Sequence, residues 1–401
     1  MKCLGLPRAS GVVALASMLA FGIQVAFALL MLRLFSPAAV GEFSLLSQIG
    51  FFWMTLALAQ APLRLLANAH IPMGLSLREA WRTSLQRGLW LLPLTLLALW
   101  LSDVPPWPAI LWVLLLALSQ MGSMLAQSLT LRAASHWQKA LVRVLPPLTA
   151  AIAAWLGASL DGSGLVLVLS AICGYAMGAA FLVPLWIATR TEAPISSEAT
   201  AALPAQTDPR STRLRLMHTL TDAMLATTLV VVWQRLYGAQ DTGWMTALLR
   251  VLGFVPALVH MAWAQVLLAS PSSSRRHHLT PMRLGLGAFA AVAVLSLGCA
   301  IALQQHWLDA RWNGMGPYLF ALALWQGCAC LSAAFGHRPF QTGHASQYSL
   351  ACMALTALQT GVLLAPLAWS TPWSASQHML AYALTSAVGL VGLTAWMSRL
   401  R

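Results

Sequence analysis

The sequence predicts an all-α membrane protein of about twelve transmembrane helices, arranged as two pseudo-symmetric six-helix bundles around a central cavity. First, 59% of the 401 residues are hydrophobic and 8% are charged, whereas soluble domains carry about 25% charged residues. Second, apolar stretches of about 20 residues recur along the chain, and this length crosses a bilayer core. Third, the two halves carry matching turns, which indicates an internal repeat.

The repeat is centred on a short polar turn between apolar stretches. Residues 33–43 read Arg-Leu-Phe-Ser-Pro-Ala-Ala-Val-Gly-Glu-Phe, and residues 235–245 read Arg-Leu-Tyr-Gly-Ala-Gln-Asp-Thr-Gly-Trp-Met. The arginines that open the two segments are 202 positions apart, and so are Gly41 and Gly243. Pro37 disfavours helical geometry in the residue before it, so the preceding helix should end there.

The apolar stretches give the predicted spans in chain order. The first half is expected to form spans over residues 11–34, 42–66, 84–101, 109–131, 140–160 and 164–188. The second half is expected to form spans over residues 214–234, 244–269, 284–303, 316–335, 347–369 and 377–398. Residues 189–213 contain prolines and acidic residues without apolar periodicity, which is typical of a linker. The predicted domains are an N-terminal bundle over 1–188, a cytoplasmic linker over 189–213 and a C-terminal bundle over 214–401.

The net charge of +13 has an explanation that requires no nucleic acid. With a cytoplasmic N-terminus, 19 of the 23 Lys and Arg residues fall on the cytoplasmic side of the predicted spans. This distribution follows the positive-inside rule and predicts that both termini are cytoplasmic. Because six is an even number, the two halves share one orientation, and the cavity is expected between them.

Arg250 is the clearest candidate for a functional residue, since ionisable groups within transmembrane segments are costly. Helical periodicity places Thr246, Arg250 and His260 on one small and polar face of the eighth span. The equivalent polar face of the second span is formed by Ser44, Gln48 and Thr55. We expect these faces to line the cavity. The alternative is a helix–helix interface from which the arginine snorkels outward.

Three further ionisable residues are candidates. Asp222 in the seventh span follows His218 by one helical turn, and a pair that titrates near neutrality would suit coupling to a proton gradient. Alternatively, this pair only orients the helix near the cytoplasmic surface. Arg64 at the inner end of the second span is placed to meet an anionic head group, or to act as one more positive-inside anchor.

Several enzyme and metal-site classes lack their sequence signals. His277 and His278 have no third ligand at a suitable spacing, so no metal site is expected. The chain has no glycine-rich phosphate loop with lysine and no Gly-x-Ser-x-Gly motif. The sequence therefore predicts neither a cofactor nor an enzymatic activity.

The turn Arg-Leu-Phe-Ser-Pro-x-x-x-Gly-x-Phe over residues 33–43 resembles the signature of bacterial polysaccharide flippases, which transport lipid-linked oligosaccharides such as O-antigen units. These proteins belong to the multidrug/oligosaccharidyl-lipid/polysaccharide exporter superfamily. Residues 243–256 are similar to the family's Gly-aromatic…Arg…Pro stretch, although Trp244 stands where Tyr is commoner. The resemblance implies a bacterial inner-membrane transporter that moves an undecaprenyl-diphosphate-linked oligosaccharide by alternating access, driven by an ion gradient.

The expected partners are the lipid-linked oligosaccharide, membrane lipids, and the glycan polymerase and chain-length proteins of the same assembly. Three other functions remain open at this point. A multidrug exporter of the same superfamily would require an acidic residue to bind cationic drugs, and the predicted spans contain few acids. A membrane glycan polymerase or ligase would be expected to carry a large outer loop. A non-transporting subunit of a glycan assembly complex is the third alternative.

Overall fold

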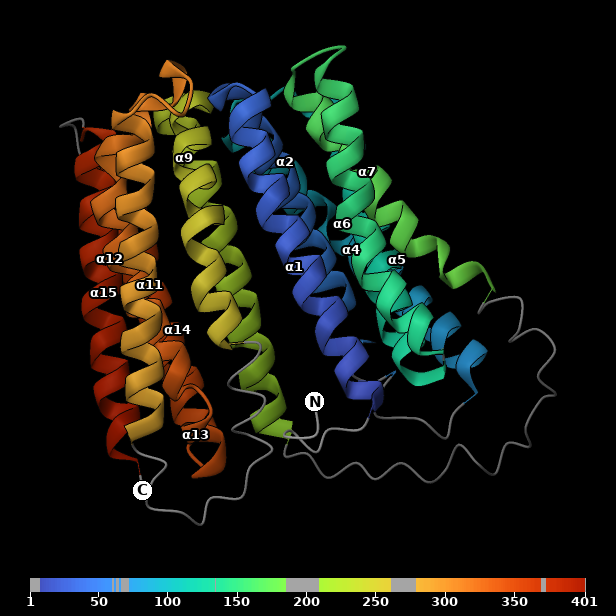
Figure 1. The fold of residues 1–401 in the computed structure, drawn as a ribbon. Helices are drawn as coiled ribbons and strands as arrows, with labels where there is room; N and C mark the ends of the chain where they lie inside the picture. The colour runs from blue at the N-terminus through green and yellow to red at the C-terminus, as the bar shows by residue number, and fades with distance from the viewer. Residues whose placement is uncertain are drawn as a thin grey trace. The chain divides into compact units, whose positions relative to one another are not determined.

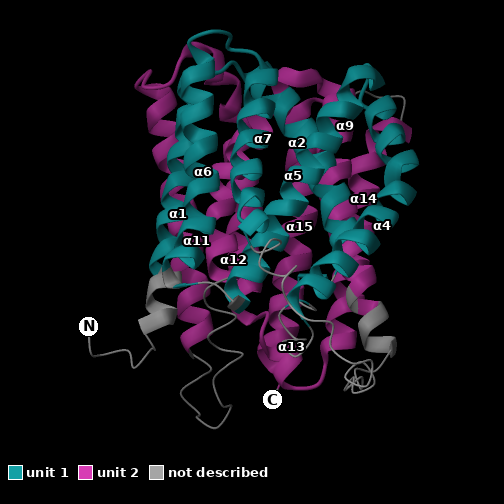
Figure 2. Cartoon of the chain, turned by 90° about the vertical axis from the view of Figure 1, so that its right-hand side faces the viewer, with its two compact units in different colours: residues 1–206 teal, residues 207–401 magenta. Residues whose placement is uncertain are grey.

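The computed structural model describes residues 8–59, 61–62, 65, 72–133, 135–184, 209–260, 279–368 and 373–400. This part of the chain consists of helices and short connections (Figure 1). The chain divides into two compact units, Met1–Gln206 and Thr207–Arg401, which Figure 2 colours separately. The predicted linker 189–213 lies mostly outside the described residues.

Six long helices form the described part of unit 1 (Figure 1). They are α1 (Arg8–Leu34), α2 (Pro37–Leu58), α4 (Met73–Leu101), α5 (Pro106–Ala133), α6 (His136–Ala158) and α7 (Gly164–Ala180). Ser36 begins α2 with extended backbone, and its hydroxyl accepts a hydrogen bond of 3.2 Å from the backbone N–H of Ala39. Pro37 occupies the first helical turn, where its missing N–H costs nothing. The predicted helix end at this turn is therefore confirmed.

Unit 2 contains one long broken helix and several continuous ones. Its elements are α9 (Pro209–Leu258), α11 (Leu279–Gln304), the 3-10 helix η4 (Ala310–Met315), α12 (Gly316–Phe335), α13 (Arg338–Gln341), α14 (Ala345–Ala368) and α15 (Ala375–Arg399). Gly238 interrupts α9 with a φ of 81° and a ψ of −179°, a conformation that glycine adopts without steric cost. α9 therefore consists of two helical arms, which correspond to the seventh and eighth predicted spans.

The helix count agrees with the predicted membrane fold. Ten helices in the described part of the chain are long and apolar enough to cross a membrane. α9 counts once among these ten although it has two arms, and α2 is not one of them. Both arms of α9 together with α2 bring the number to the predicted twelve, six in each unit. The all-α membrane class is therefore confirmed.

The start of α4 was predicted too late. α4 begins at Met73, whereas the apolar stretch alone predicted a start at residue 84. The first turns of α4 carry Arg78, Glu79 and Arg82, all exposed. These residues are good helix formers, so the helix continues beyond the apolar segment that hydropathy detects.

The most buried helix holds the equivalent position in the two units. The apolar window of α5 is 61% buried, and so is that of the candidate span Ala310–Gln341, which contains α12, whereas the other candidate spans are 11–39% buried. α5 is the fourth long helix of unit 1, and α12 is the fourth of unit 2 when the arms of α9 are counted separately. This equivalence supports the internal repeat that the matching turns indicated.

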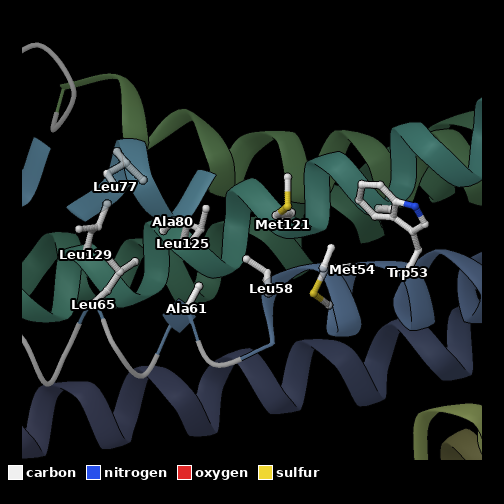
Figure 3. Close-up of a cluster of buried hydrophobic side chains, with 12 residues drawn as sticks. Trp53, Met54, Leu58, Ala61, Leu65, Leu77, Ala80, Met121, Leu125 and Leu129 are labelled. Atoms are coloured by element: carbon white, nitrogen blue, oxygen red, sulfur yellow. The ribbon is translucent and has the colours of Figure 1, made fainter. Parts of the chain in front are cut away.

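The core of unit 1 lies where α2, α4 and α5 meet. Trp53, Met54 and Leu58 of α2 pack with Leu77 and Ala80 of α4, and with further side chains of α5 (Figure 3). The α5 contributions are Ala117, Met121, Leu125 and Leu129. This cluster fixes the orientation of α2, the helix that carries the predicted polar face of unit 1.

A buried arginine joins α13 to the end of α15 in unit 2. Arg338 is 7% exposed, and its guanidinium donates hydrogen bonds to the carbonyl oxygens of Ser398 at 2.7 Å and Met397 at 3.5 Å. The last carbonyls of a helix lack the usual partners within the helix, and this side chain hydrogen-bonds to two of them. The Met397 carbonyl also accepts from the backbone N–H of Leu400 at 3.4 Å. The guanidinium carbon also lies 5.3 Å from the centroid of the Phe335 ring.

Arg338→Ala should lower the free energy of unfolding of unit 2 by about 1.5–3 kcal/mol, because it removes charge-assisted hydrogen bonds to buried carbonyls. Thermal unfolding followed by tryptophan fluorescence measures the change. Arg283→Ala, which removes an exposed arginine of α11, is the matched control and should leave the unfolding temperature nearly unchanged. Equal unfolding temperatures for both variants would contradict the capping role.

Candidate functional site

The predicted polar face of unit 2 lies on the second arm of α9. This arm begins at Ala239, so Arg250 lies about 17 Å along it by helical rise. The sequence analysis started this span at residue 244, whereas the break occurs at Gly238, so Arg250 lies deeper along the helix than predicted. Arg250 is half-buried. It therefore lies roughly midway along a span of about 30 Å, where an ionised side chain is most costly.

The face changes in exposure along the arm. Thr246 is buried, Arg250 and Gly253 are half-buried, and His260 is exposed. The Thr246 hydroxyl donates to the carbonyl oxygen of Thr242 at 2.7 Å, so its own helix satisfies it. The accessible polar groups of this face are consequently the guanidinium and the imidazole.

Gln326 of α12 was missed by the sequence analysis and adjoins this face. Its side chain is 8% exposed. A Cβ placed on Gly253 would lie 3.8 Å from its Oε1 atom, with no closer neighbour. An amide within an apolar helix was the signal that could have identified it, since polar side chains in transmembrane helices usually face a partner or a cavity.

The equivalent face of unit 1 has the same pattern. Ser44 is buried, and its hydroxyl donates to the carbonyl oxygen of Val40 at 2.6 Å. Thr246, 202 positions later, makes the equivalent bond to the residue four positions before it. Gln48 and Thr55 are half-buried, and Phe51 between them is 45% exposed. Gln48 thus occupies in unit 1 the position that Arg250 occupies in unit 2. Arg64 lies outside the described residues, and the roles of all these side chains in substrate binding stay predictions.

The structure pairs the two residues proposed for ion coupling. His218 Nε2 lies 3.1 Å from Asp222 Oδ2, with side-chain exposures of 21% and 57%. On α14, Tyr348 packs edge-on against the His218 ring at 5.9 Å, and Cys352 hydrogen-bonds to it. The pair is therefore partly exposed on one side and packed against α14 on the other. Its role in coupling stays a prediction.

A second polar cluster surrounds the break in α9. The Tyr237 hydroxyl lies 3.0 Å from Nδ1 of His378, and the Tyr318 hydroxyl donates to Oδ1 of Asp241. The Trp233 ring stacks on the His378 imidazole at 4.9 Å between centroids. These contacts attach both sides of Gly238 to α12 and α15. Sequence reasoning missed the cluster because its partners lie 77 and 141 residues apart.

Trp244 of α9 has defined contacts with η4. The indole N–H of Trp244 donates to the carbonyl oxygen of Arg311 at 3.0 Å. A Cβ placed on Gly314 would lie 2.3 Å from the Trp244 ring, so glycine leaves the space that the indole fills. Trp244 therefore links the second arm of α9 to η4.

Within the described residues, no group of three or more His, Cys, Asp or Glu side chains could hold a metal ion. The chain matches no known protein-family description. No curated protein matches it either.

One solved structure resembles the chain across nearly its full length. It is described as an inward-facing conformation of a multidrug resistance MATE family transporter of the MOP superfamily. The likeness covers 99% of this chain and 95% of that one, with 11% sequence identity and a TM-score of 0.48. A similarity this low carries no argument about function, which therefore depends on the chain's own residues.

Proposed function

We propose that this protein is a transporter that flips an undecaprenyl-diphosphate-linked oligosaccharide across the bacterial inner membrane, with both termini cytoplasmic. The observation that carries the proposal is Arg250, a half-buried arginine midway along an apolar helical arm. Arginine binds paired phosphate oxygens through two parallel hydrogen bonds, which suits a diphosphate better than lysine does. A diphosphate-sugar head group cannot cross hydrocarbon unaided, and a polar helix face would replace its water.

The repeat supports a transport cycle by alternating access. In each unit the helix that follows the matching turn carries a buried hydroxyl and, one turn later, a half-buried polar side chain. These are Ser44 and Gln48 in unit 1, and Thr246 and Arg250 in unit 2. Transporters built from repeated bundles use such equivalent helices to form their substrate sites. His260, exposed at the end of the same face, would meet the substrate at the membrane surface.

Transport by purified protein in liposomes tests the function directly. The expected result is movement of a fluorescent undecaprenyl-diphosphate oligosaccharide between leaflets, accelerated by an imposed ion gradient. Protein-free liposomes and heat-inactivated protein are the controls. Transport of cationic drugs without lipid-linked sugar would instead establish a multidrug exporter. Absence of both activities in protein that retains its helical content would indicate a non-transporting subunit.

Asp222→Asn should abolish the acceleration of transport by an imposed pH gradient while leaving slow, gradient-independent flipping intact. The reason is that the asparagine cannot accept the proton that the His218–Asp222 pair would carry. Flipping rates with and without the gradient provide the measurement. Asp309→Asn, which alters an exposed carboxylate next to η4, is the control and should retain gradient dependence. A gradient response of wild-type size in Asp222→Asn would contradict the coupling role.

A further inference from the structure

An apolar groove runs between α14 and α15 in unit 2, with a volume of about 620 Å³. Ala351, Ala354 and Leu358 of α14 line one wall, and Gly389 and Gly392 of α15 line the other. Both helices are long and apolar enough to span a membrane, so the groove lies at the depth of lipid hydrocarbon. A groove of this volume is in the range of ligand pockets.

Two glycines of α15 line the groove, of which one is covered by a leucine and the other is open. A Cβ on Gly389 would lie 2.2 Å from Cδ1 of Leu355, so this leucine reaches into the space above the glycine. A Cβ on Gly392 would meet nothing within 4 Å. The wall of the groove is therefore open at Gly392, about one helical turn after Gly389. No side chain in the described part of the chain lies within 4 Å of this position.

One end of the groove is polar and cationic. Gln347 and Trp396 line that end. Arg399, one turn after Trp396, is exposed, and His344 directly precedes the N-terminus of α14, where free backbone N–H groups favour an anion. The sequence contains no Asp or Glu after Asp309. Nothing acidic in α14 or α15 offsets this positive charge.

We propose that the groove binds one acyl chain of an anionic phospholipid, with the lipid phosphate at the end formed by His344, Gln347 and Arg399. The apolar wall matches the hydrocarbon chain, and the exposed Arg399 at the end of α15 matches the phosphate and a net negative head group. Trp396 lies at this end, as expected of an indole at the membrane interface. This site is independent of the proposed transport activity, because it uses none of the residues assigned to that activity.

Gly392→Leu should reduce retention of phosphatidylglycerol by at least about tenfold, because the leucine occupies the space of several methylene groups of the chain. The measurement is native mass spectrometry of the full-length protein, purified with added dioleoyl phosphatidylglycerol or dioleoyl phosphatidylcholine. Wild-type protein should retain one phosphatidylglycerol and little phosphatidylcholine. Arg399→Gln should remove this preference while the groove remains open.

Gly361→Leu is the matched control, because Gly361 lies on α14 away from the groove and also has nothing within 4 Å of an added Cβ. It should bind phosphatidylglycerol as the wild type does. The proposal is overturned if Gly392→Leu retains the lipid, if Gly361→Leu loses it equally, or if wild-type protein does not distinguish the two phospholipids. Two further outcomes would overturn it. If wild-type protein is a dimer that dissociates in Gly392→Leu, the groove binds a second copy of the chain. If equimolar undecaprenyl phosphate displaces phosphatidylglycerol, the groove binds the polyprenyl lipid.

Discussion

Arg250→Gln should lower the rate of lipid-linked oligosaccharide flipping in liposomes by about tenfold to 100-fold. Glutamine keeps a polar side chain on the face but has no charge and no guanidinium fork. The lost charge-assisted hydrogen bonds to phosphate are worth about 1.5–3 kcal/mol, and each 1.4 kcal/mol corresponds to a factor of about ten. Arg250→Lys should have an intermediate rate, because lysine restores the charge and not the paired geometry.

Arg235→Gln is the control for this experiment. Arg235 belongs to the same helix, α9, and is exposed at the repeated turn, so its loss should leave the flipping rate unchanged. Protein abundance and thermal unfolding must match wild type in all three variants. If Arg250→Gln transports at the wild-type rate, or if Arg235→Gln is equally slow, Arg250 does not bind the substrate phosphate.

Gly88→Ala should destabilise unit 1 by about 1–3 kcal/mol, the usual cost of overpacking a core. A Cβ at this position would lie 2.2 Å from Cζ2 of Trp53, whose side chain is 3% exposed within the cluster of Figure 3. The indole is rigid and enclosed, so α2 and α4 must separate to admit the methyl group. Glycine-to-alanine changes in helices usually raise the free energy of unfolding by about 0.5–1 kcal/mol. At Gly88 we expect the opposite effect.

Thermal unfolding of purified variants measures this effect. Gly22→Ala is the control in the same unit, since a Cβ there meets nothing within 4 Å, and its unfolding temperature should equal or exceed that of wild type. Adding Trp53→Phe to Gly88→Ala should recover part of the lost stability by removing the second ring. No recovery in the double variant would show that the clash with Trp53 is not the cause.

Features encoded locally could be predicted from the sequence. The Ser-Pro turn predicted the end of α1. α2 begins at Pro37, five residues before the predicted span, because Ser36 caps the helix and Pro37 fits its first turn. Apolar length predicted six helices in each half, and the repeat offset related Ser44 to Thr246, whose hydroxyls make equivalent bonds. Periodicity also placed His218 beside Asp222.

Features that depend on distant segments could not be predicted in this way. The break in α9 lies at Gly238, yet nothing near it in the sequence reveals that Tyr318 and His378 secure its two sides. Gln326 joins the Arg250 face because α12 packs against α9, which hydropathy does not encode. The groove likewise arises from the register of α14 against α15, which brings Gly392 opposite small residues.

The contact between Trp244 and Gly314 has a consequence for evolution. The indole occupies the volume that any side chain at position 314 would need. A larger residue at position 314 alone would therefore clash with the indole, and a smaller residue at position 244 alone would leave a void. Homologues with a larger residue at position 314 should therefore carry a smaller aromatic residue, such as tyrosine, at position 244. The two positions are expected to covary, and an alignment of homologous sequences would reveal it.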